Sequence, residues 1–209
     1  IKTLLCDAMV DLSKIRTYKM KVSEIITETY DSKTIRFRYE PSQVLDYIPG
    51  QFVMIKTSVE HNGQIKLISR AMSFASPPTR KDYFDLTVKE TPGGALSPHV
   101  VRKTKSGDEF EVKGPYGEFT FHDNSTDHVV LIGAGSGITP LMCITRYIID
   151  KKLPVKVTLL DSNKTPNDII YHKELKELQE KHHNLHFVFT ITRPEEHKWN
   201  SLTGRIDKN

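Results

Sequence analysis

The segment from Gly133 to Pro140, GAGSGITP, has the residue types and spacing best suited to binding a phosphate group. Glycines let a backbone approach a pyrophosphate closely, and the first N–H groups of a following helix point toward the anion. Thr139 suits the helix N-cap and Pro140 the first helical position. A glycine turn alone is a weak signal, because an ordinary tight connection between a strand and a helix uses glycines too.

Two other segments offer anion-binding chemistry. Residues 70–73, Arg-Ala-Met-Ser, open an expected strand, where a guanidinium can hold a phosphate with two N–H groups. The ordinary alternative is a surface arginine. Residues 92–98 contain two glycines followed by Ser97-Pro98, which is typical of a helix start with free N–H groups. A plain loop with a helix cap explains this segment equally well.

The elements that must position these residues begin with a series of short strands, in which apolar and polar residues alternate. Gly and Pro turns separate these strands. Helix periodicity is scarce in this half, apart from a short segment after Gly94. The pattern predicts a small antiparallel β-barrel. The expected strands cover residues 18–22, 33–39, 51–55, 71–75, 83–89 and 109–113.

From residue 127 onward the periodicity changes, and strands alternate with helices. This alternation predicts a parallel sheet with helices on its faces, a Rossmann-like α/β domain. The polar stretch 122–126, HDNST, marks the expected boundary. We therefore expect domains at 18–122 and 127–209, after a lead-in at 1–17 that is either a short helix or extended. The expected α/β elements are strands at 129–132, 155–160 and 185–191 and helices at 141–149 and 168–181.

Composition narrows the function classes. The 209 residues are 37% hydrophobic and 27% charged, as in a globular protein, and no apolar run is long enough to cross a membrane. We expect a cytoplasmic protein. A net charge of +4 suits an anionic ligand or an acidic partner but is too small to favour nucleic acid.

The only cysteines, Cys6 and Cys143, exclude a disulfide framework and an iron–sulfur cluster held by this chain alone. The histidine spacings predict no metal site.

Taken in chain order, four motifs resemble those of the ferredoxin–NADP reductase superfamily, which includes oxygenase and flavodoxin reductases. They are R-x-x-S at 70–73, G-G-x-x-S at 93–97, G-P-Y-G-E-F at 114–119 and G-x-G-x-G-x-T-P at 133–140. The resemblance implies a barrel that binds FAD, joined to a domain that binds NAD(P)H. It also implies hydride transfer to the flavin and electron delivery to a separate acceptor, such as ferredoxin, flavodoxin, an oxygenase or an iron–sulfur subunit.

The resemblance also assigns roles to single residues. Arg70 would hold the flavin pyrophosphate, and Ala71, Met72 and Ser73 would line the isoalloxazine. Thr139 would face the reacting rings, so Thr139 and Ser73 are the candidates next to the chemistry. The other flavin contacts would come from Thr87, Val88, Lys89, Gly93, Gly94, Ala95, Leu96 and Ser97. The other nicotinamide nucleotide contacts would come from Gly133, Gly135, Gly137, Thr192 and Arg193.

Two departures keep alternatives open. Members of the superfamily usually carry Tyr where this chain has Met72, and they continue beyond Gly204 with a further strand, helix and C-G-P segment. We therefore expect a nucleotide-binding domain that is incomplete at its C-terminus. The alternatives are a non-catalytic nucleotide-binding or regulatory subunit and a reductase that uses FMN.

The choice between NADPH and NADH should be made at the end of the third parallel strand. Thr192 and Arg193 offer a hydroxyl and a guanidinium suited to a 2′-phosphate. Asp161 favours NADH, because a carboxylate there could accept a hydrogen bond from a ribose hydroxyl, and Lys164 partly offsets it. The balance favours NADPH.

Overall fold

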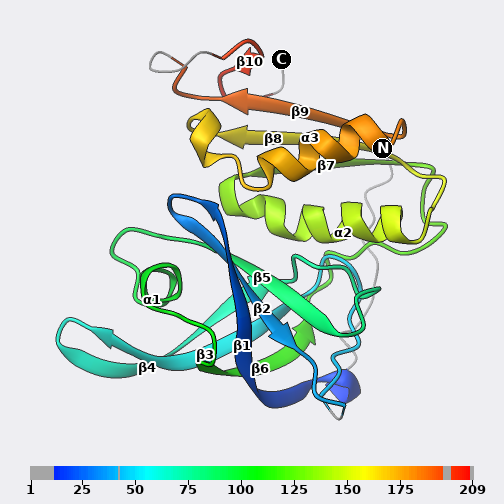
Figure 1. Ribbon diagram of the computed structural model, residues 1–209. Coiled ribbons are helices and arrows are strands. Elements are labelled where there is room, and N and C mark those ends of the chain that lie inside the picture. The colour runs from blue at the N-terminus through cyan, green and yellow to red at the C-terminus, as the bar shows by residue number, and fades with distance from the viewer. Residues whose placement is uncertain (1–11, 42, 195–198, 208–209) are drawn as a thin grey trace.

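The computed structural model describes residues 12–41, 43–194 and 199–207. Most of the expected lead-in, residues 1–11, lies outside the described residues. The chain forms an antiparallel sheet that curls into a half-barrel and a separate parallel sheet, with helix α2 between them (Figure 1). The expected combination of an antiparallel flavin-type barrel and a parallel α/β domain is confirmed.

The first sheet has the strand order β4-β3-β6-β1-β2-β5, with antiparallel neighbours. Its core is aromatic: Phe37 stacks on Phe84 with ring centroids 5.1 Å apart and meets Phe110 edge-on. The isolated bridge Phe74–Leu86 joins the end of edge strand β4 to the middle of edge strand β5. The elements are β1 (Arg16–Thr29), β2 (Ser32–Arg38), β3 (Phe52–His61), β4 (Gln64–Ser73), β5 (Tyr83–Lys89), α1 (Leu96–Arg102) and β6 (Glu109–Tyr116).

The strands of the barrel are longer than periodicity predicts. The strand expected at 51–55 continues to His61, and the one expected at 71–75 already begins at Gln64 and ends at Ser73. They form one hairpin whose turn residues, Asn62 and Gly63, have φ values of 52° and 72°. Such left-handed pairs connect two strands tightly, so the two short predictions are halves of one continuous hairpin.

The second sheet has the parallel order β10-β9-β8-β7. Both crossovers step in the same direction along the sheet, so right-handed connections place α2 and α3 on one face, as Figure 1 shows. The described part of the chain contains no helix long and apolar enough to cross a membrane. The elements are β7 (His128–Ala134), η2 (Gly135–Gly137), α2 (Ile138–Asp150), β8 (Lys156–Asn163), η3 (Pro166–Asp168), α3 (His172–Lys181), β9 (Leu185–Ile191) and β10 (Leu202–Thr203).

Strand β7 is covered on one face only, whereas the sequence predicts a parallel sheet with helices on its faces. Leu131 is buried against the helices, whereas Val130 and Ile132 are 54% and 60% exposed. Helix α2 packs on both sides, because its Cys143 belongs to the barrel core while Met142 belongs to the α/β core. Cys143 is therefore a buried residue of the core.

The helix expected from Asp168 begins four residues later. Thr165 and Asp168 form a capping box at the start of η3, but the backbone at Ile169 is extended, with a ψ of 104°, so the turn does not continue into a helix. The chain then runs through Ile169 to Tyr171, whose φ of 61° is left-handed, and α3 starts at His172. Leu175 is buried and Leu178 half-buried, as the helical pattern predicts.

Candidate functional site

The glycine turn between β7 and α2 has a separate reason for each of its three glycines. A Cβ at Gly133 would lie 2.8 Å from Leu141 Cδ1, so strand and helix pack too closely for a side chain. Gly135 has a φ of +53°, in the left-handed region. Gly137 is the N-cap of α2, and nothing lies within 4 Å of the place its Cβ would take. The N-terminus of this 13-residue helix is therefore open to an anion.

Thr139 is not the N-cap that its sequence position predicts. It is the second residue of α2 and only 3% exposed, and its Oγ1 donates a hydrogen bond to the carbonyl of Ser136 at 2.9 Å. The 3-10 turn η2 precedes it, and α2 begins at Ile138, two residues earlier than the expected Pro140. Its assignment to the nicotinamide remains a proposal, and the hydroxyl would have to leave Ser136 to bond a ligand.

A cavity of about 530 Å³ lies beside this turn, at the carboxyl ends of β7, β8 and β9. Ligands of open parallel sheets bind at this edge. Asn163 in its wall is 6% exposed, and its Oδ1 has no hydrogen-bond partner among the described residues. The wall therefore offers a buried acceptor and basic groups suited to a nucleotide. Its polar lining includes Lys89, Ser162, Asn163, Lys164, Thr192 and Arg205.

The residues expected to decide between NADPH and NADH lie in different surroundings in the structure. Thr192 lines the cavity, whereas Arg193 is outside its lining and donates its backbone N–H to the carbonyl of Lys164 at 2.9 Å. Asp161 is fully buried and accepts a 2.6 Å hydrogen bond from Asn163 Nδ2. Burial raises the pKa of Asp161 to about 7. Asp161 therefore points into the protein, and the expectation that it faces a ribose is wrong for this structure.

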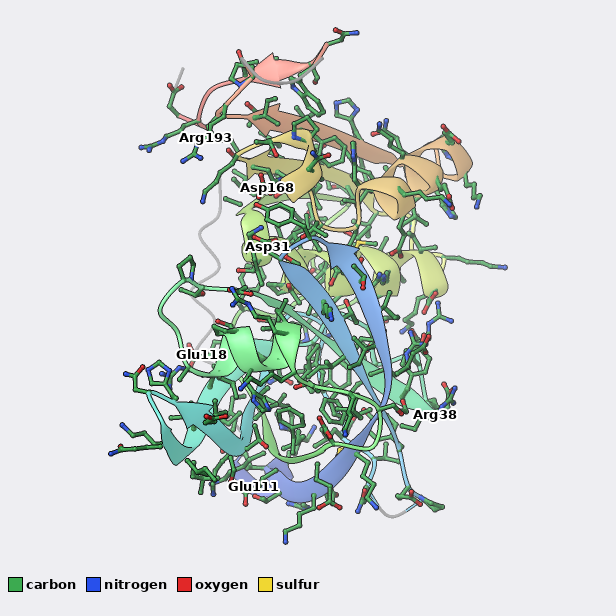
Figure 2. All side chains as sticks on the ribbon, turned by 60° about the vertical axis from the view of Figure 1, so that its left-hand side comes forward. Asp31, Arg38, Glu111, Glu118, Asp168 and Arg193 are labelled. Atoms are coloured by element: carbon green, nitrogen blue, oxygen red, sulfur yellow. The ribbon has the colours of Figure 1, made fainter. Side chains whose placement is uncertain are left out.

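Lys89 joins the barrel to the nucleotide cavity. Its Nζ lies 2.8 Å from Asp31 Oδ1 and 3.4 Å from Asp168 Oδ1, and Tyr30 donates to the same Asp168 oxygen at 2.9 Å. Burial tends to raise the pKa of Asp168, but hydrogen bonds from Thr165 and Tyr30 and the Lys89 charge hold it below its usual value. Figure 2 labels Asp31 and Asp168 on the two facing elements. These contacts tie the β1–β2 hairpin to η3.

The predicted flavin residues 70–73 lie at the end of edge strand β4. Arg70 and Ala71 are exposed, and Arg70 Nη1 donates to the neighbouring carbonyl of Ser69 at 2.7 Å. Met72 and Ser73 are half-buried, with Met72 packed against the barrel core. The backbone edge of β4 that does not pair with β3 is available for the polar rim of a ring.

The second predicted flavin segment lies on β5, the opposite edge strand. Thr87 and Val88 are 4% and 2% exposed, and Thr87 directs its hydroxyl toward Thr34 and Tyr171 rather than outward. Because the Phe74–Leu86 bridge is antiparallel, residues 70–73, which precede Phe74, lie on the same side of it as residues 87–89, which follow Leu86. The fold thus brings together two predicted segments that are distant in sequence.

The Gly93–Ser97 loop closes onto α1. Gly93 has a φ of +76°, and a Cβ at Gly94 would lie 3.0 Å from the carbonyl oxygen of Thr91. Ala95 is the N-cap of α1, Leu96 is buried, and Ser97 Oγ accepts the Thr91 N–H at 3.0 Å. Both glycines therefore serve the shape of the loop, whether or not it binds a phosphate.

Comparison with known proteins agrees with this geometry. Residues 19–121 match the family of oxidoreductase FAD-binding domains, and residues 131–209 match the family of oxidoreductase NAD-binding domains. The chain belongs to the ferredoxin–NADP reductase superfamily.

Two relatives of this chain are named as reductases of different systems. The chain is 30% identical over 194 residues to an NADH-cytochrome b5 reductase-like protein of Arabidopsis thaliana, covering 91% of this chain and 58% of that protein. It is 31% identical over 161 residues to the glycine betaine monooxygenase reductase subunit of Chromohalobacter salexigens, covering 77% of this chain and 43% of that protein. The chain thus spans about half the length of the curated relatives it matches.

A solved structure has the same fold. The cytochrome b5 reductase domain of Ulva prolifera nitrate reductase superposes with a TM-score of 0.79 and 25% identity, covering 92% of this chain and 79% of that chain. The parallel sheet and barrel therefore pair here as they do in a superfamily flavoprotein reductase.

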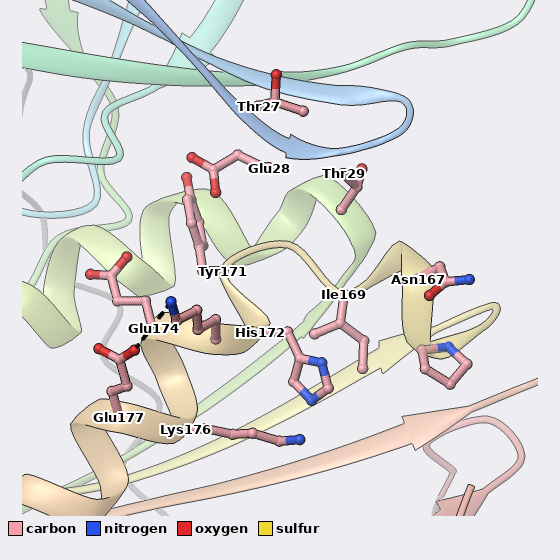
Figure 3. A pocket seen from close by; sticks show the side chains of 12 residues that line it. Thr27, Glu28, Thr29, Asn167, Ile169, Tyr171, His172, Glu174, Lys176 and Glu177 are labelled. Atoms are coloured by element: carbon pink, nitrogen blue, oxygen red, sulfur yellow. Dashed lines mark ion pairs between the residues drawn. The ribbon is translucent and has the colours of Figure 1, made fainter. Parts of the chain in front are cut away.

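A larger cleft, of about 850 Å³, contains none of the predicted site residues. It lies between the β1–β2 hairpin tip and the start of α3 (Figure 3). Its charges are mixed, with Glu28 and Glu174 facing Lys176 and His172. Burial, and then the Lys176 charge, lowers the pKa of His172. We assign no ligand to this cleft.

Sequence reasoning missed several residues that the fold brings to the nucleotide cavity. Asp168 and the side chain of Lys89 come from elements far apart in sequence. Asn163 could have been found, because it lies three residues beyond the predicted strand 155–160, at the sheet edge where ligands bind, whereas Lys164 was already named beside Asp161. Within the described ranges, no group of three or more His, Cys, Asp or Glu side chains could hold a metal ion.

Proposed function

We propose that this chain transfers a hydride from NAD(P)H to FAD and that the electrons then pass to a separate acceptor. The convergence of the two binding segments supports this proposal. Lys89 is the last of the predicted flavin residues of β5, yet its side chain lines the nucleotide cavity, and its Cδ lies 4.0 Å from where a Cβ at Gly135 would be. A flavin along β4 and β5 would therefore adjoin a nucleotide at the glycine turn.

The residues of the chain would bind and orient the two cofactors. Bound FAD supplies acceptance of a two-electron hydride and release of single electrons. Arg70 would hold a phosphate, and the open N-terminus of α2 would receive the nucleotide phosphates. The buried Asn163 Oδ1 would accept a hydrogen bond from the nucleotide. Thr139 and Ser73 would lie nearest the rings, and positioning accounts for the rate.

NADPH is the proposed preferred nucleotide, with one change in the residues responsible. Thr192, Lys164 and Arg205 line the cavity and carry a hydroxyl and two positive charges suited to a 2′-phosphate. Arg193 lies outside the lining, so we place Lys164 before it as the selector.

The acceptor is proposed as ferredoxin, flavodoxin, an oxygenase or an iron–sulfur subunit, in the cytoplasm. One relative's name describes a monooxygenase reductase subunit and another a cytochrome b5 reductase-like protein, which supports a separate electron acceptor.

The decisive experiment is anaerobic stopped-flow reduction of the purified protein. We expect a yellow protein whose flavin, released and identified, is FAD and which NADPH bleaches faster than NADH does. Released FMN would favour the FMN reductase instead. A colourless protein that takes up no FAD would contradict the proposal and favour a nucleotide-binding or regulatory subunit.

A further inference from the structure

Two side chains of the α/β domain reach the barrel next to the predicted flavin segments. Arg146 extends from α2, and Tyr171 precedes α3. We infer that Arg146 and Tyr171 form an interdomain clamp that sets the distance between the flavin strands and the nicotinamide-binding turn. The inference rests on the proposed function, since it concerns how the same two rings are positioned.

Tyr171 anchors strand β5 through its hydroxyl. The residue is 4% exposed, its φ is 61°, and its ring points toward the barrel strands (Figure 3). The hydroxyl hydrogen-bonds to Thr87 Oγ1, which lies 2.6 Å from Thr34 Oγ1. A left-handed backbone at a tyrosine is strained, so the surrounding contacts must hold it in place.

The direction of these hydrogen bonds follows from counting protons. Thr34 donates its only hydroxyl proton to Glu28 Oε1 at 2.6 Å. Each hydroxyl has one proton, so Thr87 donates to Thr34 and Tyr171 donates to Thr87. Burial raises the pKa of Tyr171, which keeps its hydroxyl protonated. The chain of hydroxyls therefore ties the α/β domain to the barrel in a single defined arrangement.

Arg146 anchors the end of β4. Its Nη1 donates to the carbonyl of Ala75 at 2.8 Å, two residues beyond Ser73. Its other nitrogens donate to both carboxylate oxygens of Glu174 at 2.9 and 2.6 Å, and its guanidinium lies 4.9 Å from the Tyr171 ring centroid. Two directed bonds to Glu174 fix the planar guanidinium, so the third can place Ala75 accurately.

The two anchors connect the elements that matter for hydride transfer. Ala75 also donates its N–H to the carbonyl of Asp85 at 2.8 Å, so the ends of β4 and β5 move together. Arg146 lies seven residues after Thr139, on the same face of α2. Any shift of α2 relative to the barrel would break these contacts and change the separation of the proposed rings.

The test compares Tyr171→Phe and Arg146→Gln with a matched control, Arg80→Gln. Arg80 also crosses the domains, lying 3.0 Å from Asp150, but it is half exposed and touches neither flavin segment. In the FAD-loaded protein we expect hydride transfer to slow about 10-fold for Tyr171→Phe and up to about 100-fold for Arg146→Gln, because small misplacements are costly. Flavin content and nucleotide Kd should stay within about twofold of wild type. Arg80→Gln should behave as wild type.

A second readout needs no cofactor. Hydrogen exchange of the cofactor-free protein should be faster at residues 70–75 and 83–89 in both clamp variants and unchanged in Arg80→Gln. Should Arg146→Gln fail to fold, Tyr171→Phe, which removes one hydroxyl, decides alone.

Three outcomes would count against one or both proposals. Unchanged exchange, or hydride transfer per bound flavin within about twofold of wild type, overturns the clamp. Stability and flavin content that fall together at an unchanged rate also overturn it, because that pattern indicates a purely structural role. If NAD(P)H never reduces the wild-type protein, the proposed function is contradicted instead. Hydrogen exchange of the clamp variants then still tests whether Arg146 and Tyr171 hold the flavin strands in place.

Discussion

Lys89 is the residue in which the two halves of the proposed site meet. It ends the predicted flavin segment of β5, lines the nucleotide cavity and pairs with carboxylates of both domains. A phosphate arriving in the cavity would compete with Asp31 and Asp168 for the same ammonium group. Residues of this kind make nucleotide binding depend on how the two domains contact each other.

Arg70 carries the first prediction. Replacing it by alanine should weaken FAD binding by about 2 kcal/mol, roughly 30-fold in Kd, because a phosphate loses a charge-assisted partner. The measurement is fluorescence titration of the apoprotein with FAD. Arg38→Ala is the control, since Arg38 is another exposed barrel arginine and pairs with exposed Asp82 at 3.3 Å. Equal affinity in both variants would remove Arg70 from the flavin site.

Asp161 carries a prediction about pH. Its pKa rises from 3.8 unfolded to about 7 folded, so the folded state binds the proton more tightly. This contribution to stability is fully present below pH 4 and is lost as pH rises to about 7, by about 4 kcal/mol at most. Asp161→Asn should therefore be more stable than wild type at pH 8 but not at pH 4. Urea unfolding at both values checks this, and a wild-type-minus-variant difference that is constant with pH would contradict it.

At the scale of elements, the connection from β7 to α2 separates two uses of glycine. Gly133 lacks a side chain so that α2 can pack closely, whereas Gly137 leaves space open for a ligand. Gly133→Ala should destabilise the protein by about 1–3 kcal/mol, because the added methyl overpacks against buried Leu141.

Gly137→Ala is the matched variant at this connection. Its φ of −62° suits alanine and no atom is near, so stability should change by less than about 0.5 kcal/mol. Nucleotide affinity should nevertheless fall, because the methyl group enters the anion site. Thermal unfolding and nucleotide titration of both variants measure the two effects. A destabilised Gly137→Ala protein with normal affinity would reverse the assignment.

At the scale of the whole molecule, polar contacts between distant segments hold the domains together. Asp150 of α2 accepts hydrogen bonds from Thr79 and Arg80 of the barrel. Arg146 and Tyr171 form the clamp. Asp168 contacts Tyr30 and Lys89. Directional bonds of this kind define one relative placement, whereas apolar packing alone would tolerate sliding.

Asp168 carries the prediction at this scale. Its lowered pKa means that its contribution to stability is present above the usual carboxyl pKa and is lost as pH falls through the lowered value. Asp168→Asn should cost about 1–3 kcal/mol at pH 7 and less near pH 2, because protonation of the wild-type carboxyl removes its advantage as pH falls. Asp46→Asn is the control, because Asp46 is exposed and its carboxylate pairs weakly, at 3.9 Å, with the Lys14 ammonium group. Chemical unfolding at both pH values checks this, and an equal cost at both would sink it.

The sequence alone determined the order of elements and the type of each sheet. Period-two alternation with frequent turns predicted the barrel, and alternating strands and helices around GAGSGITP predicted the parallel sheet; both are local properties of the chain. The family also followed from four motifs in order. Element ends were less accurate, as at β4 and α3, because the Asn62-Gly63 turn and the Thr165–Asp168 capping box act over a few residues that periodicity does not register.

Only the tertiary structure decided where side chains point. Asp161 and Thr139 have residue types suited to a ligand, yet burial and a local hydrogen bond turn them inward. Lys89 and Asp168 share one cavity, and Tyr171 meets Thr87, across 79 and 84 residues of chain. Such pairs depend on how the two sheets pack against α2, and no local pattern of residues encodes that packing.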